Sequence, residues 1–255
     1  MNFIVAASTD IGLIKETNQD CYSVRVYSSK FGKIVFAVMC DGMGGLEKGE
    51  IASASVANAF CKWADNRFPT LCEEDLNDDT IRKEWTDIVK EYNGKIQTYS
   101  LTCGIHMGTT VTTILLHSNR YFIMNIGDTR AYEISDTVDV LTKDQTVVAQ
   151  EVELGHLSWE EAEQDPRRSV LLQCVGASEE IIPEFVFGKT KLDAVYMLCT
   201  DGFRHEISND EIFQYLNPDV MLNCDGMKRN MEQLIDLNKQ RKERDNISVI
   251  SIRTF

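Results

Sequence analysis

Five aspartates stand where apolar, strand-like runs begin or end, and their placement is the feature of this sequence best suited to chemistry. They are Asp20, Asp41, Asp128, Asp201 and Asp245. A carboxylate at the end of a buried strand is costly unless a partner neutralises it, and converging carboxylates raise one another's pKa unless a cation is present. Because hard oxygen ligands favour Mg²⁺ or Mn²⁺ over zinc, the pattern predicts a divalent-metal site whose chemistry stays open.

Two of these aspartates belong to Asp-Gly pairs, which alone are ordinary turn dipeptides. The pairs at 41–42 and 201–202 differ because each directly follows a long apolar run, and further glycines follow the first pair at 44–45. Without side chains the backbone can come close to an ion, and the carbonyl of Gly42 can itself be a ligand. Both pairs are therefore candidate metal-binding turns.

Short apolar runs typical of β-strands dominate the rest of the chain. The nearly continuous apolar run at 33–40 is typical of a central strand covered on both faces. The expected strands are 3–8, 21–27, 33–40, 109–116, 120–126, 194–199 and 247–252. Apolar residues at helical spacing predict helices over 50–66 and 80–101 and a further helix around 227–235.

The order of these elements indicates the fold class. Short turns between neighbouring strands favour antiparallel pairing, and the helices lie between groups of strands instead of alternating with single strands. The order predicts an α+β sandwich and argues against a doubly wound parallel sheet. No linker, repeat or low-complexity stretch interrupts the sequence, so we expect a single domain over 1–255. The polar stretch at 144–168 is predicted to be a mobile flap beside the metal site that influences substrate choice.

The charge balance of this 255-residue chain excludes some classes of function. Lys and Arg total 26 against 40 for Asp and Glu, a net charge of -14. Such a chain repels nucleic-acid phosphates and anionic membranes, so we expect neither as a partner. The lack of a long apolar span and of a signal-like N-terminus predicts a cytoplasmic protein. No heptad or apolar patch suggests a dimer, so a monomer is favoured.

Cysteine and histidine offer no second metal site in the sequence. The eight cysteines are scattered and form no C-x-x-C pair, so we expect reduced thiols and neither a structural zinc site nor a redox role. The four histidines, at 106, 117, 156 and 205, fit no metal-ligand spacing and are interpreted as surface or hydrogen-bonded residues.

Several short motifs occur in the order found in one known family. They are Thr9-Asp10-Ile11-Gly12, Asn18-Gln19-Asp20, Cys40-Asp41-Gly42-Met43-Gly44-Gly45, Gly108-Thr109-Thr110, Ile126-Gly127-Asp128-Thr129-Arg130, Thr142-Lys143-Asp144-Gln145-Thr146, Pro166-Arg167-Arg168-Ser169, Cys199-Thr200-Asp201-Gly202 and Asp245-Asn246-Ile247-Ser248. Along nearly its whole length the chain resembles the metal-dependent protein phosphatases, the protein phosphatase 2C-like or PPM family, in their bacterial form. Each motif is weak alone, but six or more in order make chance similarity improbable.

The resemblance implies both a fold and an activity. The implied fold is a four-layer α-β-β-α sandwich of two antiparallel sheets flanked by helices. The implied activity is hydrolysis of phosphoserine and phosphothreonine in proteins by a metal-bound hydroxide, without a covalent intermediate. A serine/threonine kinase is then the natural opposing partner.

The resemblance also assigns roles to the acidic residues. The implied ligands of two Mg²⁺ or Mn²⁺ ions are Asp41, Gly42 through its carbonyl, Asp201 and Asp245. Asp41 would bridge the two ions, and Asp20 would hold water bound to them. Asp128, together with Asp201, matches the position of a third ion in bacterial members.

One position departs from the family pattern. Family members usually place an arginine that grips the substrate phosphate five residues after the Asp of the first motif, and here that position is Lys15. Lysine keeps the charge but loses the bidentate fork. Lys15 is therefore a candidate phosphate contact, with an ordinary exposed loop lysine as the alternative. If it is a bystander, Arg130 and Arg168 are the next candidate cations.

Three functions remain to be separated. The first is an active phosphatase for phosphoserine and phosphothreonine proteins. The second is a phosphoprotein-binding pseudophosphatase, which only Lys15 favours and the intact acidic set opposes. The third is a phosphatase for a small phosphorylated metabolite. Metal-dependent turnover of an aryl phosphate separates enzyme from binding module, and a phosphopeptide panel separates protein from metabolite substrates.

Overall fold

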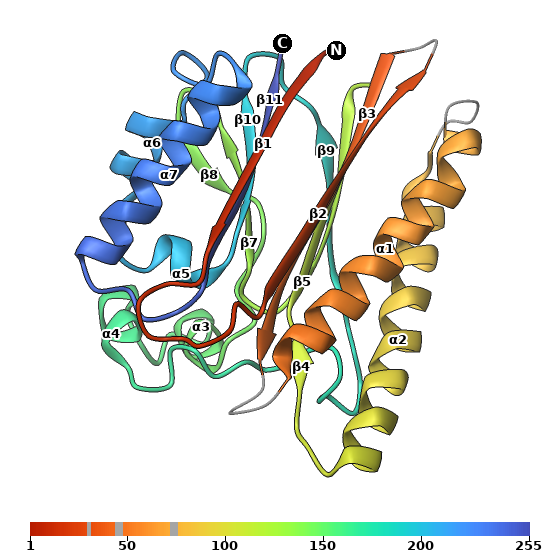
Figure 1. The fold of residues 1–255 in the computed structure, drawn as a ribbon, viewed down its shortest axis with the longest axis vertical. Coiled ribbons are helices and arrows are strands. Elements are labelled where there is room, and N and C mark those ends of the chain that lie inside the picture. Colours follow the sequence, from red (N-terminus) through yellow and green to blue (C-terminus); the bar gives the residue numbers. More distant parts are fainter. Residues whose placement is uncertain (30–31, 44–47, 72–75) are drawn as a thin grey trace.

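Two antiparallel sheets pack face to face between two layers of helices (Figure 1). The structure is a computed structural model that describes residues 1–29, 32–43, 48–71 and 76–255. The predicted α+β sandwich is confirmed. Gly44 and Gly45, which we expected to extend the metal-binding turn, and Cys72 lie outside the described residues.

The first sheet has five strands and the second has six. The five-stranded sheet runs in the order β1 (Phe3–Asp10), β11 (Ile247–Thr254), β10 (Val195–Cys199), β7 (Arg130–Ile134) and β8 (Val138–Val140). The six-stranded sheet runs β2 (Asp20–Ser29), β3 (Gly32–Met43), β5 (Val111–His117), β6 (Arg120–Ile126) and β9 (Glu184–Lys189), with β4 (Gly108–Thr109) paired to β3.

Two long helices cover the six-stranded sheet and three others cover the five-stranded one. The first pair is α1 (Gly49–Leu71) and α2 (Asp78–Cys103); the second group is α5 (Asp201–Arg204), α6 (Asn209–Leu216) and α7 (Cys224–Gln240). Two short helices, α3 (Val147–Glu153) and α4 (Trp159–Gln164), lie at the lower end of the molecule in Figure 1. Within the described residues, no helix is both long and apolar enough to cross a bilayer.

Strand β3 shows why its sequence is apolar without alternation. Phe36 and Val38 belong to the apolar cluster between this sheet and α1 and α2, whereas Val35 and Ala37 belong to the cluster between the two sheets. Successive strand residues point to opposite faces, so a strand covered on both faces must be apolar throughout. The prediction of a central, doubly covered strand is confirmed.

The expected elements are present, but several short ones were missed. Strands β7, β8 and β9 and helices α5 and α6 had no assignment from the sequence. Helix α6 carries a readable signal, because Ser208 and Glu211 form a reciprocal capping box at its start. The short strands were missed because segments of three to six residues with polar members acquire strand geometry from their neighbours in the sheet.

The segment at 144–168 is tied to the body of the protein through its first residues, which also pair with the residues just beyond its end. The Arg130 guanidinium donates to both carboxylate oxygens of Asp144, and Thr146 pairs with Leu171 as an isolated β-bridge. Helices α3 and α4 account for its weak helical signals. Movement of this segment, and the single-domain organisation, stay predictions.

Candidate functional site

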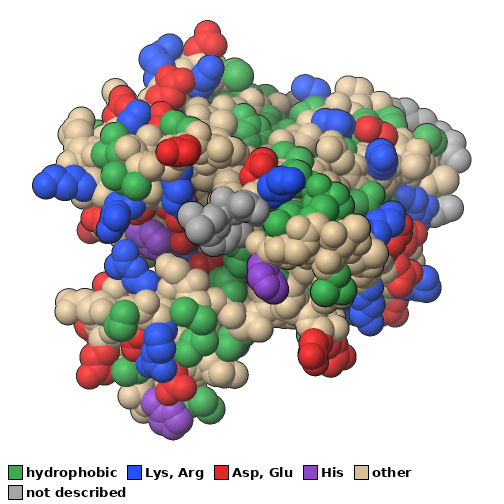
Figure 2. Space-filling view, turned by 60° about the horizontal axis from the view of Figure 1, so that its bottom comes forward, with side chains coloured by type: hydrophobic (Ala, Val, Ile, Leu, Met, Phe, Trp, Pro, Cys, Tyr) green, Lys and Arg blue, Asp and Glu red, His purple; other side chains and the backbone are tan. Residues whose placement is uncertain are grey.

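The acidic strand ends meet at one cavity of about 520 Å³. Its lining includes Asp41, Gly42, Asp128, Asp201 and Asp245, from both sheets and the loops beside them. Figure 2, which brings the lower end of Figure 1 forward, shows a hollowed face with acidic and basic side chains beside the hollow. Four of the five aspartates singled out in the sequence thus line one cavity, and the fifth, Asp20, is not among its lining residues.

Pairing of β2 with β3 places Asp20 beside Asp41. The two residues are register partners where β2 begins and β3 approaches its end. The backbone N–H of Asp41 donates to Thr110 Oγ1 (2.9 Å), and its carbonyl accepts from the Thr110 N–H (2.9 Å). These bonds fix the backbone at Asp41 independently of its carboxylate.

Gly42 is required by close packing of the backbone. A Cβ at this position would stand 2.4 Å from the Gly49 carbonyl oxygen and 2.5 Å from that of Gln19. Any side chain would therefore push apart the start of α1 and the end of the loop before β2. The glycine has a packing role that the sequence argument, which considered only access to an ion, did not include.

A second close approach brings Asp201 and Asp245 together. A Cβ on Gly202 would lie 2.2 Å from the Asn246 carbonyl oxygen, so the first turn of α5 touches the loop before β11. The Asn246 side chain accepts from the Gln19 N–H (2.9 Å) and donates to the Ile11 carbonyl (2.9 Å). Asn246 thereby joins the loop before β11 to the N-terminal loop that carries the first motif.

Lys15 is the one cation among the described residues that line the acidic cavity. Its Nζ lies 2.7 Å from Asp245 Oδ1, and the two side chains are 39% and 37% exposed. Burial acts to lower the pKa of Lys15, but the contacts with Asp245 and the field of Asp41 outweigh it and raise that pKa. The predicted phosphate-gripping position thus does face the cavity, where it is paired with a candidate metal ligand.

Burial and mutual repulsion dominate the electrostatics of the aspartates. Burial, followed by Asp20 and Asp201, raises the pKa of Asp41 well above its ordinary value. Burial, followed by the charge of Asp201, raises the pKa of Asp20 to about 7 and that of Asp128 to about 7. These residues cannot all be charged at neutral pH without a compensating cation.

The oxygen donors fit a hard divalent cation. Asp20 Oδ1 and Asp201 Oδ1 are buried and have no hydrogen-bond partner among the described residues, which is costly for a carboxylate oxygen. In the described part of the chain, no three acidic, His or Cys side chains are already arranged to hold an ion. The cavity supplies oxygens of the kind that Mn²⁺ and Mg²⁺ prefer, and binding would draw them together.

We expect Mn²⁺ to raise the unfolding temperature more at pH 8 than at pH 5. Without metal, the pKa of Asp20 and that of Asp128 are about 7, whereas aspartate in an unfolded chain titrates near about 3.9. Between these values the unfolded chain releases protons that the folded chain retains. Folding stability therefore falls as pH rises from about 4 to about 7, and it stays reduced above that. A divalent cation relieves the repulsion only where the carboxylates are charged.

The measurement is thermal unfolding by circular dichroism at both pH values, with MnCl₂ or with EDTA. Asp128→Asn removes one of the two titrating groups, so the pH-dependent part of the Mn²⁺ effect should shrink in that variant. An equal Mn²⁺ effect at pH 5 and pH 8 in the wild type would contradict the electrostatic explanation.

The sequence argument missed two residues that lie against the carboxylates. His205 Nε2 lies 3.5 Å from Asp201 Oδ2, and its Nδ1 lies 3.4 Å from Glu243 Oε2. One Nη of Arg204 lies 3.2 Å from the Asp128 carbonyl oxygen. The available signal for His205 was its spacing of four residues after Asp201, which places both on one side of a helical turn.

The other candidate cations lie elsewhere. Arg130 is paired with Asp144, and both line a second cavity of about 700 Å³, as does Arg168. Residues 144–168 form much of the lining of this second cavity. The acidic cavity, by contrast, is lined by none of the described residues of that segment; Ser169 and Leu171, which do line it, lie just beyond the segment. The predicted flap thus borders the acidic cavity without lining it.

Known proteins share both this sequence pattern and this fold. The model of the family described as protein phosphatase 2C matches residues 15–237. Protein phosphatase PhpP of Streptococcus pneumoniae is 28% identical over 221 residues, which are 86% of this chain and 86% of PhpP. The serine/threonine protein phosphatase PstP of Mycobacterium tuberculosis is 27% identical over 248 residues, 96% of this chain but 44% of PstP.

A solved structure adds the metal to the comparison. The catalytic domain of PstP, in complex with two manganese ions, is 26% identical and matches with a TM-score of 0.75 over 99% of each chain. The four-layer arrangement expected from the motifs is therefore also that of known phosphatases.

Proposed function

This chain belongs to the protein phosphatase 2C family of metal-dependent serine/threonine phosphatases. We propose that its acidic cavity holds two Mn²⁺ or Mg²⁺ ions and is the site where phosphoserine and phosphothreonine in proteins are hydrolysed. The observation that carries the proposal is the convergence of four aspartates on one cavity, with Asp20 paired beside Asp41. Among them, Asp20 Oδ1 and Asp201 Oδ1 are buried and have no hydrogen-bond partner among the described residues.

Four of the aspartates and Gly42 receive roles under this proposal. Asp41 would serve both ions, since it pairs with Asp20 in the β2–β3 register and lines the cavity together with the other aspartates. Gly42 would contribute its carbonyl, and Asp201 and Asp245 would complete the ligand set. Asp20, whose Oδ2 accepts a hydrogen bond from Thr200 (3.1 Å), would hold water at the edge of the site through its other oxygen.

When bound, two such ions supply an activated water and positive charge for the phosphoryl oxygens. The protein's own side chains do the remaining work. Lys15 would leave Asp245 to the metal and bind a phosphoryl oxygen as a point charge. The chain that carries Lys15 is held in place by Asn246, which binds the carbonyls of Ile11 and, at 3.3 Å, Thr17. No serine, cysteine or histidine nucleophile is required.

A phosphoprotein substrate is supported by two relatives that are named as protein phosphatases. An opposing serine/threonine kinase is part of the proposal, because such a kinase would produce that substrate. A cytoplasmic location and a monomeric state stay predictions of the sequence. The pseudophosphatase alternative rests only on lysine in place of the family's arginine, and the position of Lys15 in the cavity lining supports a phosphate contact instead.

The experiment that tests the proposal is turnover of three substrate classes after removal of metal and addition of MnCl₂ or MgCl₂. We expect no activity with chelator, metal-dependent hydrolysis of p-nitrophenyl phosphate, and higher kcat/KM for phosphothreonine and phosphoserine peptides than for small phosphorylated metabolites. Binding of phosphopeptides without turnover would favour the pseudophosphatase. Preference for a metabolite would place the substrate outside proteins, and full activity in excess chelator would contradict the metal role.

A further inference from the structure

We propose that Arg204 supplies the positive charge at Asp128 that a third ion would otherwise supply, so that this chain works with two ions and binds a third only weakly. The proposal rests on the proposed function, because it assumes the two-ion site beside Asp128. It concerns a positioning residue on α5 that none of the motifs contains.

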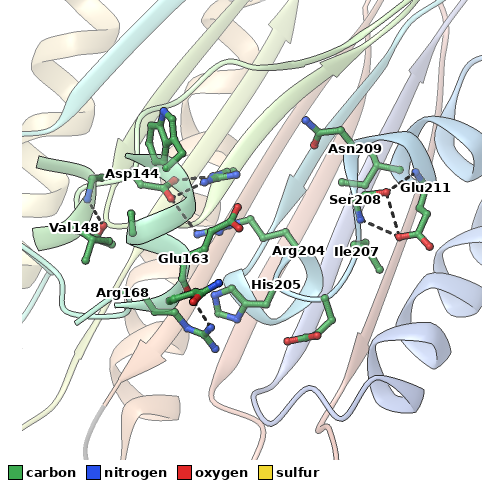
Figure 3. Close-up of a pocket in the computed structure, with 18 of the residues that line it drawn as sticks. Asp144, Val148, Glu163, Arg168, Arg204, His205, Ile207, Ser208, Asn209 and Glu211 are labelled. Atoms are coloured by element: carbon green, nitrogen blue, oxygen red, sulfur yellow. Dashed lines mark hydrogen bonds and ion pairs between the residues drawn. The ribbon is translucent and has the colours of Figure 1, made fainter. Parts of the chain in front are cut away.

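The contacts place the Arg204 guanidinium directly behind Asp128. One Nη donates to the Asp128 carbonyl oxygen (3.2 Å) and lies 4.0 Å from Asp128 Oδ2. The two side chains are 12% and 7% exposed, so little water screens the interaction. Figure 3 shows Arg204 in the wall of the second cavity, reaching toward Asp144, with His205 beside it.

Asp144 does not cancel the charge of Arg204. Its carboxylate accepts from Arg130 Nε (2.7 Å) and Nη2 (2.8 Å), so one guanidinium already occupies both oxygens. Arg204 adds a further contact to Oδ2 at 3.2 Å, and its buried Nε has no partner among the described residues. One carboxylate is therefore shared by two guanidiniums, which leaves one positive charge beside Asp128.

The charges of the site then balance with two ions. Asp20, Asp41, Asp201 and Asp245 carry four negative charges when ionised, and two divalent ions carry four positive ones. Asp128 is the remaining carboxylate, and Arg204 faces it. Lys15 and Glu16, which also line the cavity, add one charge of each sign. A third divalent ion would therefore add two positive charges to a region that is already neutral.

The expected effect is a weak third site. A unit charge within about 4–6 Å shifts carboxylate protonation equilibria by about one to three pKa units, roughly tenfold to a thousandfold. A divalent ion at Asp128 would meet repulsion of at least that kind from Arg204. Removal of the Arg204 charge should therefore tighten the weakest Mn²⁺ site by about tenfold or more.

The test is a titration of metal-stripped protein with MnCl₂, followed by calorimetry and by the electron paramagnetic resonance signal of free Mn²⁺. We expect the wild type to bind two ions per chain at concentrations that leave a third site largely unfilled. Arg204→Gln should gain a third ion, whereas Arg204→Lys, which keeps the charge, should resemble the wild type. In the double variant Arg204→Gln with Asp128→Asn, the gain should disappear.

Arg241→Gln is the matched control, because Arg241 lines the same second cavity but is exposed and bound to Glu211. This variant removes one positive charge that does not contact Asp128, so the number of Mn²⁺ ions bound per chain should stay at two. Three ions of similar affinity in the wild type would overturn the proposal without any variant. The proposal would also be overturned if Arg204→Gln left the Mn²⁺ affinity of the weakest site unchanged. The same holds if the double variant still bound a third ion. If the proposed function itself were wrong, the titration would give a different result, because the wild type would then lack the first two bound ions as well.

Discussion

Asp41→Asn is expected to reduce kcat/KM at saturating Mn²⁺ by about a thousandfold or more. Two metal ions contribute several kcal/mol of transition-state stabilisation, and Asp41 is the residue proposed to serve both of them. Asparagine keeps the shape and one oxygen but loses the charge and the second anionic ligand atom. The backbone bonds from Asp41 to Thr110 do not involve the carboxylate, so the fold should persist.

A stability measurement separates this effect from unfolding. Because burial and the neighbouring aspartates raise the pKa of Asp41 well above its ordinary value, the charged form is unfavourable without metal. Asp41→Asn should therefore unfold, in EDTA at pH 8, at the same temperature as the wild type or a higher one. The control is Asp136→Asn, an exposed aspartate between β7 and β8. Wild-type activity in Asp41→Asn with metal bound would contradict its ligand role.

Lys15→Ala is expected to lower kcat/KM by roughly tenfold to a hundredfold at saturating metal. Loss of a hydrogen bond to a charged group costs about 1.5–3 kcal/mol, which corresponds to that range. The variant should not need more Mn²⁺, because Lys15 pairs with Asp245 and its removal leaves that carboxylate free for the metal. Lys15→Arg should retain activity, since it keeps the charge and adds the bidentate fork.

The comparison requires kcat/KM and the Mn²⁺ concentration for half-maximal activity in each variant. Lys228→Ala, which removes an exposed lysine on α7, is the matched control. If Lys15→Ala equals the wild type, Lys15 is a bystander. Arg130 and Arg168, the alternative phosphate contacts suggested by the sequence, would then be poor candidates. Both line the second cavity, and Arg130 is paired with Asp144.

The sequence by itself determined the layered fold and the carboxylates of the site. Alternation, apolar runs and Asp-Gly pairs are local properties, and a carboxylate that follows a buried strand must lie at the edge of its sheet. For that reason Asp41 and Asp201 could be predicted to lie at strand ends, as candidate metal ligands, before any packing was known.

Only the tertiary structure decided what lies between and behind those carboxylates. Lys15 and Asp245 are 230 positions apart in the sequence, and their contact depends on the packing of two loops. Arg204 reaches Asp128 because β10 pairs with β7, which places the start of α5 beside the end of the β6–β7 turn. Sheet pairing and close backbone approaches are set by the burial of whole strands and helices, so the charges that tune this site could not be found from local patterns.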